Sequence, residues 1–508
     1  MFESDFLRPD PGSRRAYRAA ITRTAAVLAE TLPRRPCSGK SPAELAALLT
    51  GDPCPAEGTP LETVLERTRD IIANSVVVSH PRTAAHLHCP PLVAALAAEV
   101  VLSGLNQSMD SFDQAPAATV VEQQLLGWLC RQAGLPASAD GTMTPGGTLS
   151  NYMGLLLARE TWCRERLGWP VREKGLPSEA RRCRILCSEM AHFSVEKAAV
   201  QLGLGTESVV KVAVDADYRL CVRDLDRQLA LLAARRLIPM AIVATAGTTD
   251  VGAVDPLTDV AARARAVGAW LHVDAAYGGA LLFSERHRRR LRGLEQADSL
   301  TLDFHKLCWQ PISCGAFLVR QASHFGCIRL HADYLNPEGH EELGIPDLVT
   351  RSVLTTRRFD ALKVWFSFQV LGGRKLAALI DRTLGLATVA AAAIRRQPRL
   401  ELLQEPSLGC VVFRYRPVRA GADQDALNEA LRRQLFDSGQ AVLGHTRIGG
   451  RTYLKLTFLN PCLEPAQVAG LVQLVAGKGE VLEPEYGVGN AAEVNNRFRA
   501  SLNPCTGA

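Results

Sequence analysis

The sequence lacks the segments that would direct a protein to a membrane or out of the cell. Its N-terminus, MFESDFLRPD, does not show the basic and then apolar pattern of a secretory signal. The longest apolar stretch, Pro91 to Leu105, is too short to cross a bilayer and contains Glu99. We therefore expect a cytoplasmic protein without a membrane partner.

Charge and cysteine patterns argue against two further classes of protein. Lysine and arginine total 58 against 52 acidic residues, a net charge of +6, but the charges are interspersed and form no dense basic tract for nucleic acid. The 14 cysteines are scattered through apolar segments, and no CxxC pair occurs. Because Cys183 and Cys187 also lie at the start of and within one predicted strand segment, we predict buried free thiols rather than disulfides or a metal site.

The apolar pattern predicts an α/β protein with several parts. At 508 residues and 47% hydrophobic composition, the chain can bury large cores in two or three domains. Short β-rich runs alternate with helices in the central part, which is typical of a mainly parallel sheet covered by helices. We assign residues 1–80 to an N-terminal helical segment, 81–375 to the large domain, 376–480 to a small C-terminal α+β domain and 481–508 to a loose tail.

The predicted elements place the polar motifs at strand ends, where ligands of parallel sheets bind. The large-domain strands are predicted at 184–188, 208–214, 240–246, 270–274, 299–303 and 314–320, with helices at 195–202, 224–235 and 256–267. A long helical segment from 355 to about 395, broken at Gly372 and Gly373, leads to small-domain strands at 410–415, 441–443 and 452–458 and helices at 424–437 and 464–474. The N-terminal helices are predicted at 13–32 and 60–73.

The strongest chemical signal lies at the end of one predicted strand. Asp274 closes the apolar run in HVDAAYGG, and Lys306 follows 32 residues later (306 − 274) in LDFHK. A pyridoxal phosphate enzyme needs an amine to hold the cofactor aldehyde as a Schiff base and a carboxylate to keep the pyridine nitrogen protonated. Taken singly, Asp274 could instead cap a loop and Lys306 could lie on the surface.

A glycine turn precedes a predicted helix in TPGGTLSN, Thr144 to Asn151. Gly147 lets the backbone approach closely, Thr148 supplies a hydroxyl, and the helix start presents N–H groups, which together suit a phosphate monoester. A plain glycine turn with a hydroxyl cap is the alternative. The segment is not a Walker loop, because no GK[ST] follows.

Four further residues accompany these motifs. His192, in AHFSVEKAA, follows a strand end, where an imidazole can stack on a flat ring or simply cap the next helix. Thr249, in ATAGTTDVGAVDP, can bond to the cofactor or only hold its turn. Ala276 leaves room for a ring over the strand, and His305 can reach a phosphate.

In order and spacing, these motifs resemble the group II pyridoxal phosphate-dependent amino acid decarboxylases over about residues 60 to 475. The resemblance implies a fold type I, aspartate aminotransferase-like large domain, pyridoxal 5'-phosphate, and a homodimer with active sites at the interface. Lys306 then looks like the Schiff-base lysine, Asp274 the pyridinium partner and His192 the ring-stacking residue. Gly147, Thr148 and His305 look like phosphate ligands, with Thr249 nearby.

Two further segments resemble the family's substrate-handling parts. The polar segment from His331 to Asp347 resembles a mobile loop, in which Tyr334 looks like the acid that protonates Cα. A core tyrosine at a loop entrance is the alternative. The segment from Ala84 to Gln123 most resembles L-2,4-diaminobutyrate decarboxylases. It contains the candidate substrate residues His86, His88, Asp110 and Asp113.

We therefore predict a decarboxylase of a small cationic L-amino acid, foremost L-2,4-diaminobutyrate, which would give 1,3-diaminopropane. A cationic substrate needs a carboxylate or carbonyl in its pocket, although at least one of Asp110 and Asp113 could be a solvated loop acid. The alternatives are a lysine or ornithine decarboxylase of a siderophore pathway, or a glutamate or aromatic amino acid decarboxylase. An oxidative, aldehyde-forming enzyme is disfavoured by Tyr334, and a non-catalytic relative by the intact cofactor positions.

Overall fold

The structure, a computed structural model, describes residues 5–419 and 421–486. The chain divides into two compact units. The larger unit comprises Leu87–Gly385 and Pro406–Cys410, and the smaller one takes the described parts of Met1–His86, Leu386–Glu405 and Val411–Ala508. These boundaries differ from the predicted ones at 80 and 375. The N-terminal helical segment also groups with C-terminal residues rather than standing alone.

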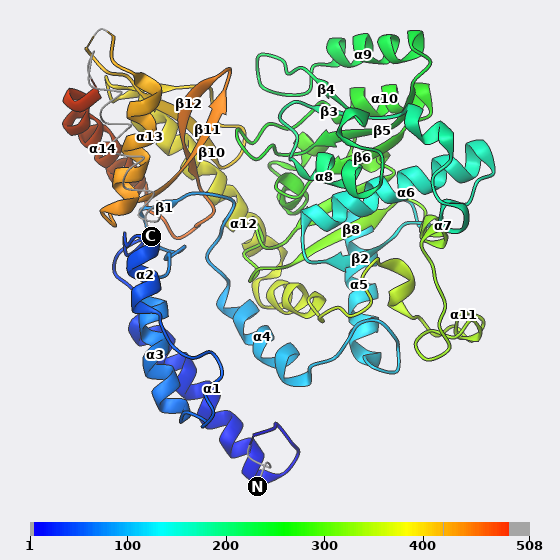
Figure 1. The fold of residues 1–508 in the computed structure, drawn as a ribbon, viewed down its shortest axis with the longest axis horizontal. Coiled ribbons are helices and arrows are strands. Elements are labelled where there is room, and N and C mark those ends of the chain that lie inside the picture. The colour runs from blue at the N-terminus through cyan, green and yellow to red at the C-terminus, as the bar shows by residue number, and fades with distance from the viewer. Residues whose placement is uncertain (1–4, 420, 487–508) are drawn as a thin grey trace, which may run out of the picture. The chain divides into compact units, whose positions relative to one another are not determined.

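The larger unit is built on a seven-stranded sheet in the order β2-β8-β7-β6-β5-β3-β4 (Figure 1). Strands β4, β3, β5, β6 and β7 pair in parallel, whereas β8 is antiparallel to both β7 and β2. This mainly parallel sheet confirms the predicted α/β fold class. The strands are β2 (Asp140–Thr144), β3 (Cys183–Ser188), β4 (Val209–Val212), β5 (Ile238–Thr245), β6 (Trp270–Asp274), β7 (Ser299–Asp303) and β8 (Gly315–Val319).

Helix α6 (Gly147–Leu167) is the element that anchors the glycine turn to this sheet, because it contacts β5, β6, β7 and β8. Its Met153, Leu155 and Leu157 side chains are fully buried. Burying each side chain of this kind stabilises the fold by about 1.5–3 kcal/mol, so the first turn of α6 is held firmly at the strand ends. The other helices of this unit include α4 (Val93–Leu105), α5 (Pro116–Gln132), α7 (Val171–Lys174), α8 (Ser194–Gln201), α9 (Val222–Ala234), α10 (Leu257–Val267) and α11 (Gly339–Glu342).

Helix α12 (Ala361–Arg395) is the only helix of the described residues that is long and apolar enough to cross a membrane. Half of its apolar window is buried inside the chain. Its path is broken at Gly372, where φ is 67° and ψ is 160°, as the paired glycines of the sequence predict. A kinked and half-buried helix of this kind is typical of a protein core.

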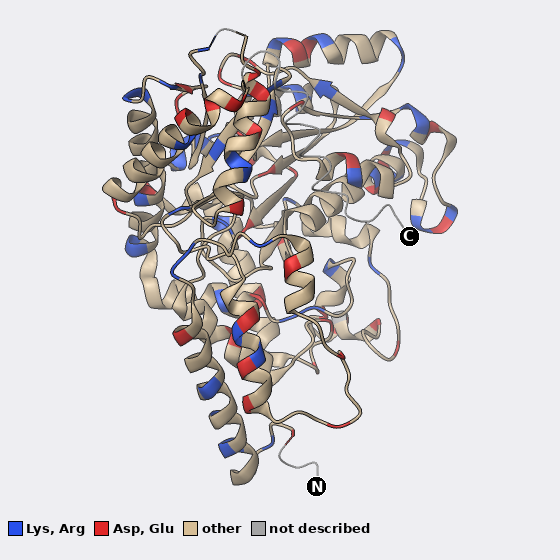
Figure 2. Cartoon of the chain, turned by 60° about the vertical axis from the view of Figure 1, so that its left-hand side comes forward, with Lys and Arg blue, Asp and Glu red and all other residues tan. Residues whose placement is uncertain are grey.

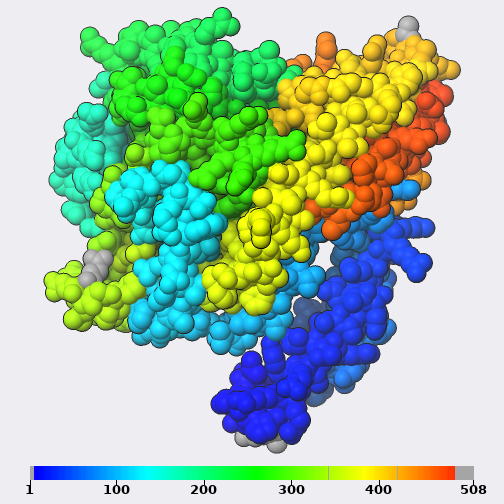
Figure 3. Space-filling view, turned by 180° about the vertical axis from the view of Figure 1, so that it is seen from behind, coloured from blue at the N-terminus to red at the C-terminus, as the bar shows by residue number. Residues whose placement is uncertain are grey.

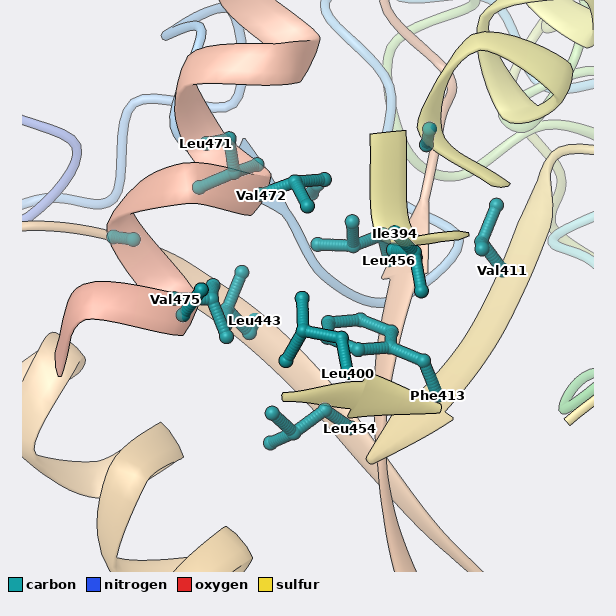
Figure 4. Packing of buried hydrophobic residues seen from close by; sticks show 14 of the residues in the cluster. Ile394, Leu400, Val411, Phe413, Leu443, Leu454, Leu456, Leu471, Val472 and Val475 are labelled. Carbon is teal, nitrogen blue, oxygen red and sulfur yellow. The ribbon is translucent and has the colours of Figure 1, made fainter. Parts of the chain in front are cut away.

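The smaller unit contains a five-stranded sheet in the order β1-β11-β12-β10-β9. Leu454 and Leu456 of β12 and Phe413 of β10 share a core with Leu471 and Val475 of α14 (Figure 4). In Figure 3 the orange and red residues of α14 lie against the yellow residues of this unit. Its elements are α1 (Pro11–Thr31), α2 (Pro42–Leu48), α3 (Leu61–Ala73), α13 (Gln424–Asp437), α14 (Pro465–Leu482), β1 (Thr83–Ala84), β9 (Leu400–Leu402), β10 (Cys410–Tyr415), β11 (Val442–Ile448) and β12 (Arg451–Thr457).

Strand β1 explains why the unit boundary lies beyond residue 80. Thr83 pairs with Val442 and Ala84 with Leu443, so this short segment adds a parallel strand to the small sheet. At the other end, α14 and a short 3-10 helix, Glu483–Tyr486, continue past the predicted start of the tail at 481. The remainder of that predicted tail, residues 487–508, lies outside the described residues.

The distribution of charged residues and the state of the cysteines agree with what the sequence predicts. Lysine and arginine are interspersed with acidic residues along the helices (Figure 2). The cysteines of the described residues are free thiols, and most of them are buried, which confirms the prediction for this part of the chain.

Candidate active site

The turns that follow β2, β5, β6 and β7 enclose a cavity of about 740 Å³ in the larger unit. The carboxyl ends of parallel strands share one edge of a sheet, so motifs that are far apart in the sequence meet here. The predicted residues that line this cavity are Gly147, Thr148, His192, Thr249, Asp274, Ala276, His305 and Lys306.

Asp274 is the last residue of β6, and only 6% of it is exposed. Its carboxylate accepts hydrogen bonds from the side-chain amide of Asn151, at 2.7 Å, and from the backbone amide of Ala276, at 3.1 Å. Both donors are neutral. The carboxylate is therefore oriented by the protein, while its charge is left for a cationic group in the cavity.

Asn151 belongs to a buried hydrogen-bond network behind Asp274. Its Oδ1 accepts from His272 Nε2 at 2.9 Å and from Thr301 Oγ1 at 2.8 Å. The Nδ1 atom of His272 lies 2.7 Å from Ser299 Oγ. Burial lowers the pKa of His272 to about 4, although Asp274 acts in the opposite direction. His272 is therefore neutral at neutral pH, and the network holds Asp274 without neutralising it.

The same hydrogen-bond network extends to His192, which lies two residues before the start of α8. Ser194 Oγ accepts a hydrogen bond from Asn151 Nδ2 at 2.8 Å and donates its own proton to His192 Nδ1, also at 2.8 Å. Burial lowers the pKa of His192, and Asp274 opposes this shift. The ring is therefore neutral near neutral pH, and its Nε2–H is left for other partners.

The start of α6 forms a polar cradle that suits an anion. No side chain caps this helix, and Gly146 at the N-cap has φ 146°. A Cβ on Gly146 would lie 3.0 Å from His305 Cε1, and a Cβ on Gly147 would lie 3.1 Å from Ala276 Cβ. Glycine at both positions therefore keeps the backbone amides accessible at the positive end of the helix dipole.

Lys306 lies in the turn after β7, beside this cradle. Its Nζ atom is 2.9 Å from Asp303 Oδ2, and His305 Nε2 is 3.7 Å from the same oxygen. The Asp303 side chain is only 2% exposed, and its Oδ1 atom has no hydrogen-bond partner. The lysine amine thus forms an ion pair in the cavity wall.

Several residues of the site are not predicted by the sequence motifs. Asn151 lies inside TPGGTLSN, and His272 precedes Asp274 by two residues, which places both on the same face of a strand. That period of two is the signal that could have revealed His272. Asp303, in DFHK, and Thr245, whose buried hydroxyl has no partner, also line the cavity. Asp303 ends a predicted strand three residues before Lys306, so the same strand-end pattern that identifies Lys306 could have found it. No comparable local pattern marks Thr245.

The structure does not bring Tyr334, His86 or His88 to the cavity wall. Tyr334 is 89% exposed. Leu87 lines the cavity, whereas the exposed histidines on either side of it do not. The substrate and proton-donor roles of these residues remain predictions.

Asp110 and Asp113 also lie away from the cavity wall. Asp110 is buried, and its Oδ1 accepts from the Ser111 amide at 3.1 Å. Asp113 accepts from the Ser111 hydroxyl at 2.5 Å. Both carboxylates organise their own loop in the single chain, and their predicted contact with substrate remains a prediction.

The cavity fits pyridoxal phosphate in each chemical respect. Lys306 supplies an amine, Asp274 supplies an oriented carboxylate, and the uncapped start of α6 supplies amides for a phosphate. The unpartnered hydroxyl of Thr245 offers a further polar contact in the same wall.

Comparison with known proteins gives a consistent result. The pyridoxal-dependent decarboxylase conserved domain matches residues 42–416. The L-2,4-diaminobutyrate decarboxylase of Rhizobium meliloti (strain 1021) is 43% identical over 484 residues, covering 94% of this chain and 95% of the relative. The L-2,4-diaminobutyrate decarboxylase of Acinetobacter baumannii is 40% identical over 463 residues, covering 89% and 90%.

A solved structure from Vibrio parahaemolyticus matches the fold with a TM-score of 0.87 and 39% identity. It is described as the glutamate decarboxylase domain of diaminobutyrate-pyruvate transaminase and L-2,4-diaminobutyrate decarboxylase. The match covers 95% of this chain and 99% of that one, so the two chains share both units of the fold.

Proposed function

Because the chain belongs to the pyridoxal-dependent decarboxylase family, we propose that it converts L-2,4-diaminobutyrate to 1,3-diaminopropane and carbon dioxide. Family membership makes the chain a pyridoxal phosphate-dependent carboxy-lyase that acts on an amino acid. The choice of diaminobutyrate depends on one observation, the 43% and 40% identity to two L-2,4-diaminobutyrate decarboxylases over nearly the whole chain. A cytoplasmic location accompanies this proposal.

Each of three residues in the cavity has a separate role toward the cofactor. The bound cofactor supplies an electron-accepting ring. Lys306 would hold the cofactor through its amine, which lines the cavity. Asp274 keeps a proton on the pyridine nitrogen, because its buried carboxylate is held only by neutral donors. His192 lines the same cavity and would stack on the bound ring, and its neutral imidazole would add no competing charge.

The phosphate is assigned to the start of α6. The accessible amides at Gly147, the hydroxyl of Thr148 and the imidazole of His305 surround this position. Thr249 lies in the same wall, on the turn after β5. An anion held at a helix N-terminus is stabilised by the backbone N–H groups and the helix dipole together.

We place the complete active site at the interface of a homodimer. Tyr334 is exposed on the single chain and lies outside the wall of its cavity, so it would contact a substrate only in another arrangement of the loop or in the cavity of a second copy. Delivered by a second copy, it would protonate Cα after carbon dioxide leaves. A tyrosine that is solvent-exposed in one chain can meet the reacting carbon only if its loop closes or a partner carries it there.

Recognition of a cationic substrate requires a further acidic or carbonyl group. Of the described residues that line the cavity, only Asp274 and Asp303 are acidic, and both already have partners in the cofactor site. The side-chain ammonium of diaminobutyrate would otherwise be left unpaired. Asp110 and Asp113, carried by the second copy, are the proposed source of this charge.

A panel of amino acids tests the substrate assignment. Purified protein with pyridoxal phosphate should release carbon dioxide and amine fastest from diaminobutyrate. Ornithine should follow with a kcat/KM lower by about 10- to 200-fold per methylene, and glutamate, norvaline and aromatic amino acids should be poorer still. If glutamate or an aromatic amino acid were the best substrate, the proposal that the site recognises a cationic side chain would be refuted. The assignment as a decarboxylase would be unaffected.

Matched variants test whether Asp110 or Asp113 pairs with the side-chain ammonium of the substrate. Asp110→Asn or Asp113→Asn should raise KM for diaminobutyrate and narrow its advantage over norvaline. Asp226→Asn, which makes the same change on the exposed surface of α9, should leave both quantities unchanged. If neither loop variant changes the selectivity, the side-chain ammonium has another partner.

A further inference from the structure

Asp303 is the least satisfied charged group in the cavity. It is the last residue of β7, its side chain is 2% exposed, and Oδ1 has no hydrogen-bond partner. Its other oxygen contacts Lys306 Nζ at 2.9 Å. A buried carboxylate is stable as an anion only while a cation or several donors remain beside it.

The carboxylate also borders the phosphate cradle. A Cβ on Gly147 would lie 3.2 Å from Asp303 Oδ2, and a Cβ on Gly146 would lie 3.7 Å from Oδ1. Both glycines belong to the uncapped start of α6. An ionised Asp303 would therefore face the anionic phosphate across a short, buried gap.

Capture of the cofactor removes the cation that stabilises this anion. Lys306 can attack an aldehyde only after its ammonium loses a proton, and the bound nitrogen is no longer the free ammonium that pairs with Asp303. Other titratable groups around the carboxylate offer little compensation. Burial lowers the pKa of His192 and raises the pKa of the Cys314 thiol, so both are neutral at neutral pH. Asp274 adds a second carboxyl group to the same cavity wall, and His305 Nε2 lies 3.7 Å from Asp303 Oδ2, beyond hydrogen-bond distance.

We propose that Asp303 accepts the proton of the Lys306 ammonium when the cofactor is captured, and thereafter faces the phosphate as a neutral acid. The N–H bond of the ammonium breaks and an O–H bond forms on the carboxyl group. The freed electron pair of nitrogen forms a bond to the aldehyde carbon, and the two remaining amine protons leave with the carbonyl oxygen as water. One proton transfer thus frees the nucleophile and removes the like charge beside the phosphate. This inference rests on the proposed function, since it needs pyridoxal phosphate at this site.

The rate of cofactor capture tests this step. Cofactor-free protein is mixed with pyridoxal phosphate, and the absorbance of the lysine-bound cofactor is followed over a series of pH values. Asp303→Asn keeps the shape of the side chain but cannot accept a proton. We expect capture at pH 7 to be at least ~100-fold slower than in the unchanged protein, on the scale of losing a positioned base. The variant should recover as the pH rises into the range where lysine loses its proton unaided.

Pyridoxine 5'-phosphate, which has no aldehyde, serves as the second probe. The asparagine amide can donate to a phosphate and carries no negative charge, so Asp303→Asn should bind this probe at least as tightly as the unchanged protein. Asp226→Asn on the exposed surface of α9 should match the unchanged protein in both measurements.

Each outcome decides between the explanations. Equal capture rates and equal pH profiles for Asp303→Asn and the unchanged protein would overturn the proton transfer. Slow capture at every pH together with weakened binding of pyridoxine 5'-phosphate would also overturn it, because Asp303 would then only shape the site. Failure of the unchanged protein to capture pyridoxal phosphate would instead refute the proposed function.

Discussion

Replacing Gly154 with alanine should destabilise the larger unit, although the same change usually strengthens a helix. Gly154 lies inside α6, where alanine is favoured over glycine by about 0.8–1.0 kcal/mol. At this position, however, a Cβ would lie 2.4 Å from Nδ1 and 2.6 Å from Cε1 of His272. His272 cannot move aside freely, because it is fully buried and bonded through both ring nitrogens to Ser299 and Asn151.

The expected size of the effect follows from these contacts. Overpacking a buried site costs about 1–3 kcal/mol, and losing one hydrogen bond of the displaced ring costs about 1–3 kcal/mol more. Subtracting the helix gain of about 1 kcal/mol leaves a net loss of about 3 kcal/mol. At roughly 2 °C per kcal/mol, the unfolding midpoint should fall by about 6 °C.

Thermal unfolding of the cofactor-free protein, followed by circular dichroism, measures this change. Gly385→Ala is the matched control, because Gly385 lies in helix α12 of the same unit and a Cβ there meets nothing within 4 Å. The control should raise the midpoint by about 2 °C. Gly154→Ala should also weaken cofactor binding through Asn151 and Asp274, whereas the control should not. If Gly154→Ala were as stable as the control, the packing argument would be refuted.

Four further outcomes are expected. Borohydride reduction should fix the cofactor on Lys306, as identified by peptide mass spectrometry, and a label on another lysine would contradict the assignment. Asp274→Ala should lower turnover at least ~100-fold with little change in the unfolding midpoint, whereas a loss below about threefold would point to another partner of the ring nitrogen. Tyr334→Phe should still release carbon dioxide but divert product toward aldehyde, and a normal amine yield and rate would exclude Tyr334 as the proton donor. His272 stays neutral in the folded chain between pH 6.5 and about 4 while the unfolded chain binds a proton, so stability should fall as pH drops through this window. His272→Gln should show a shallower fall in the free energy of urea unfolding, and equal slopes would refute this.

The elements that position the site were accessible from local sequence pattern. The sequence predicts β6 at Trp270–Asp274 and β7 at Ser299–Asp303, which are their observed bounds, because buried parallel strands appear as short apolar runs. Strand β2, with the sequence DGTMT, escapes prediction because Met143 is its only large apolar residue. The short strand β1 also escapes, since two residues carry no detectable period.

By itself, the sequence determined which motifs meet at the strand ends, because the carboxyl ends of parallel strands necessarily share one edge of the sheet. Lys306 and Asp274 therefore line one cavity, as their strand positions imply. Only the tertiary structure decided their partners. Asn151 reaches Asp274 across 123 residues of sequence, and this pairing depends on how α6 packs against β6. Local composition likewise indicates a polar loop around Tyr334, but only the tertiary structure places this side chain on the surface of the single chain.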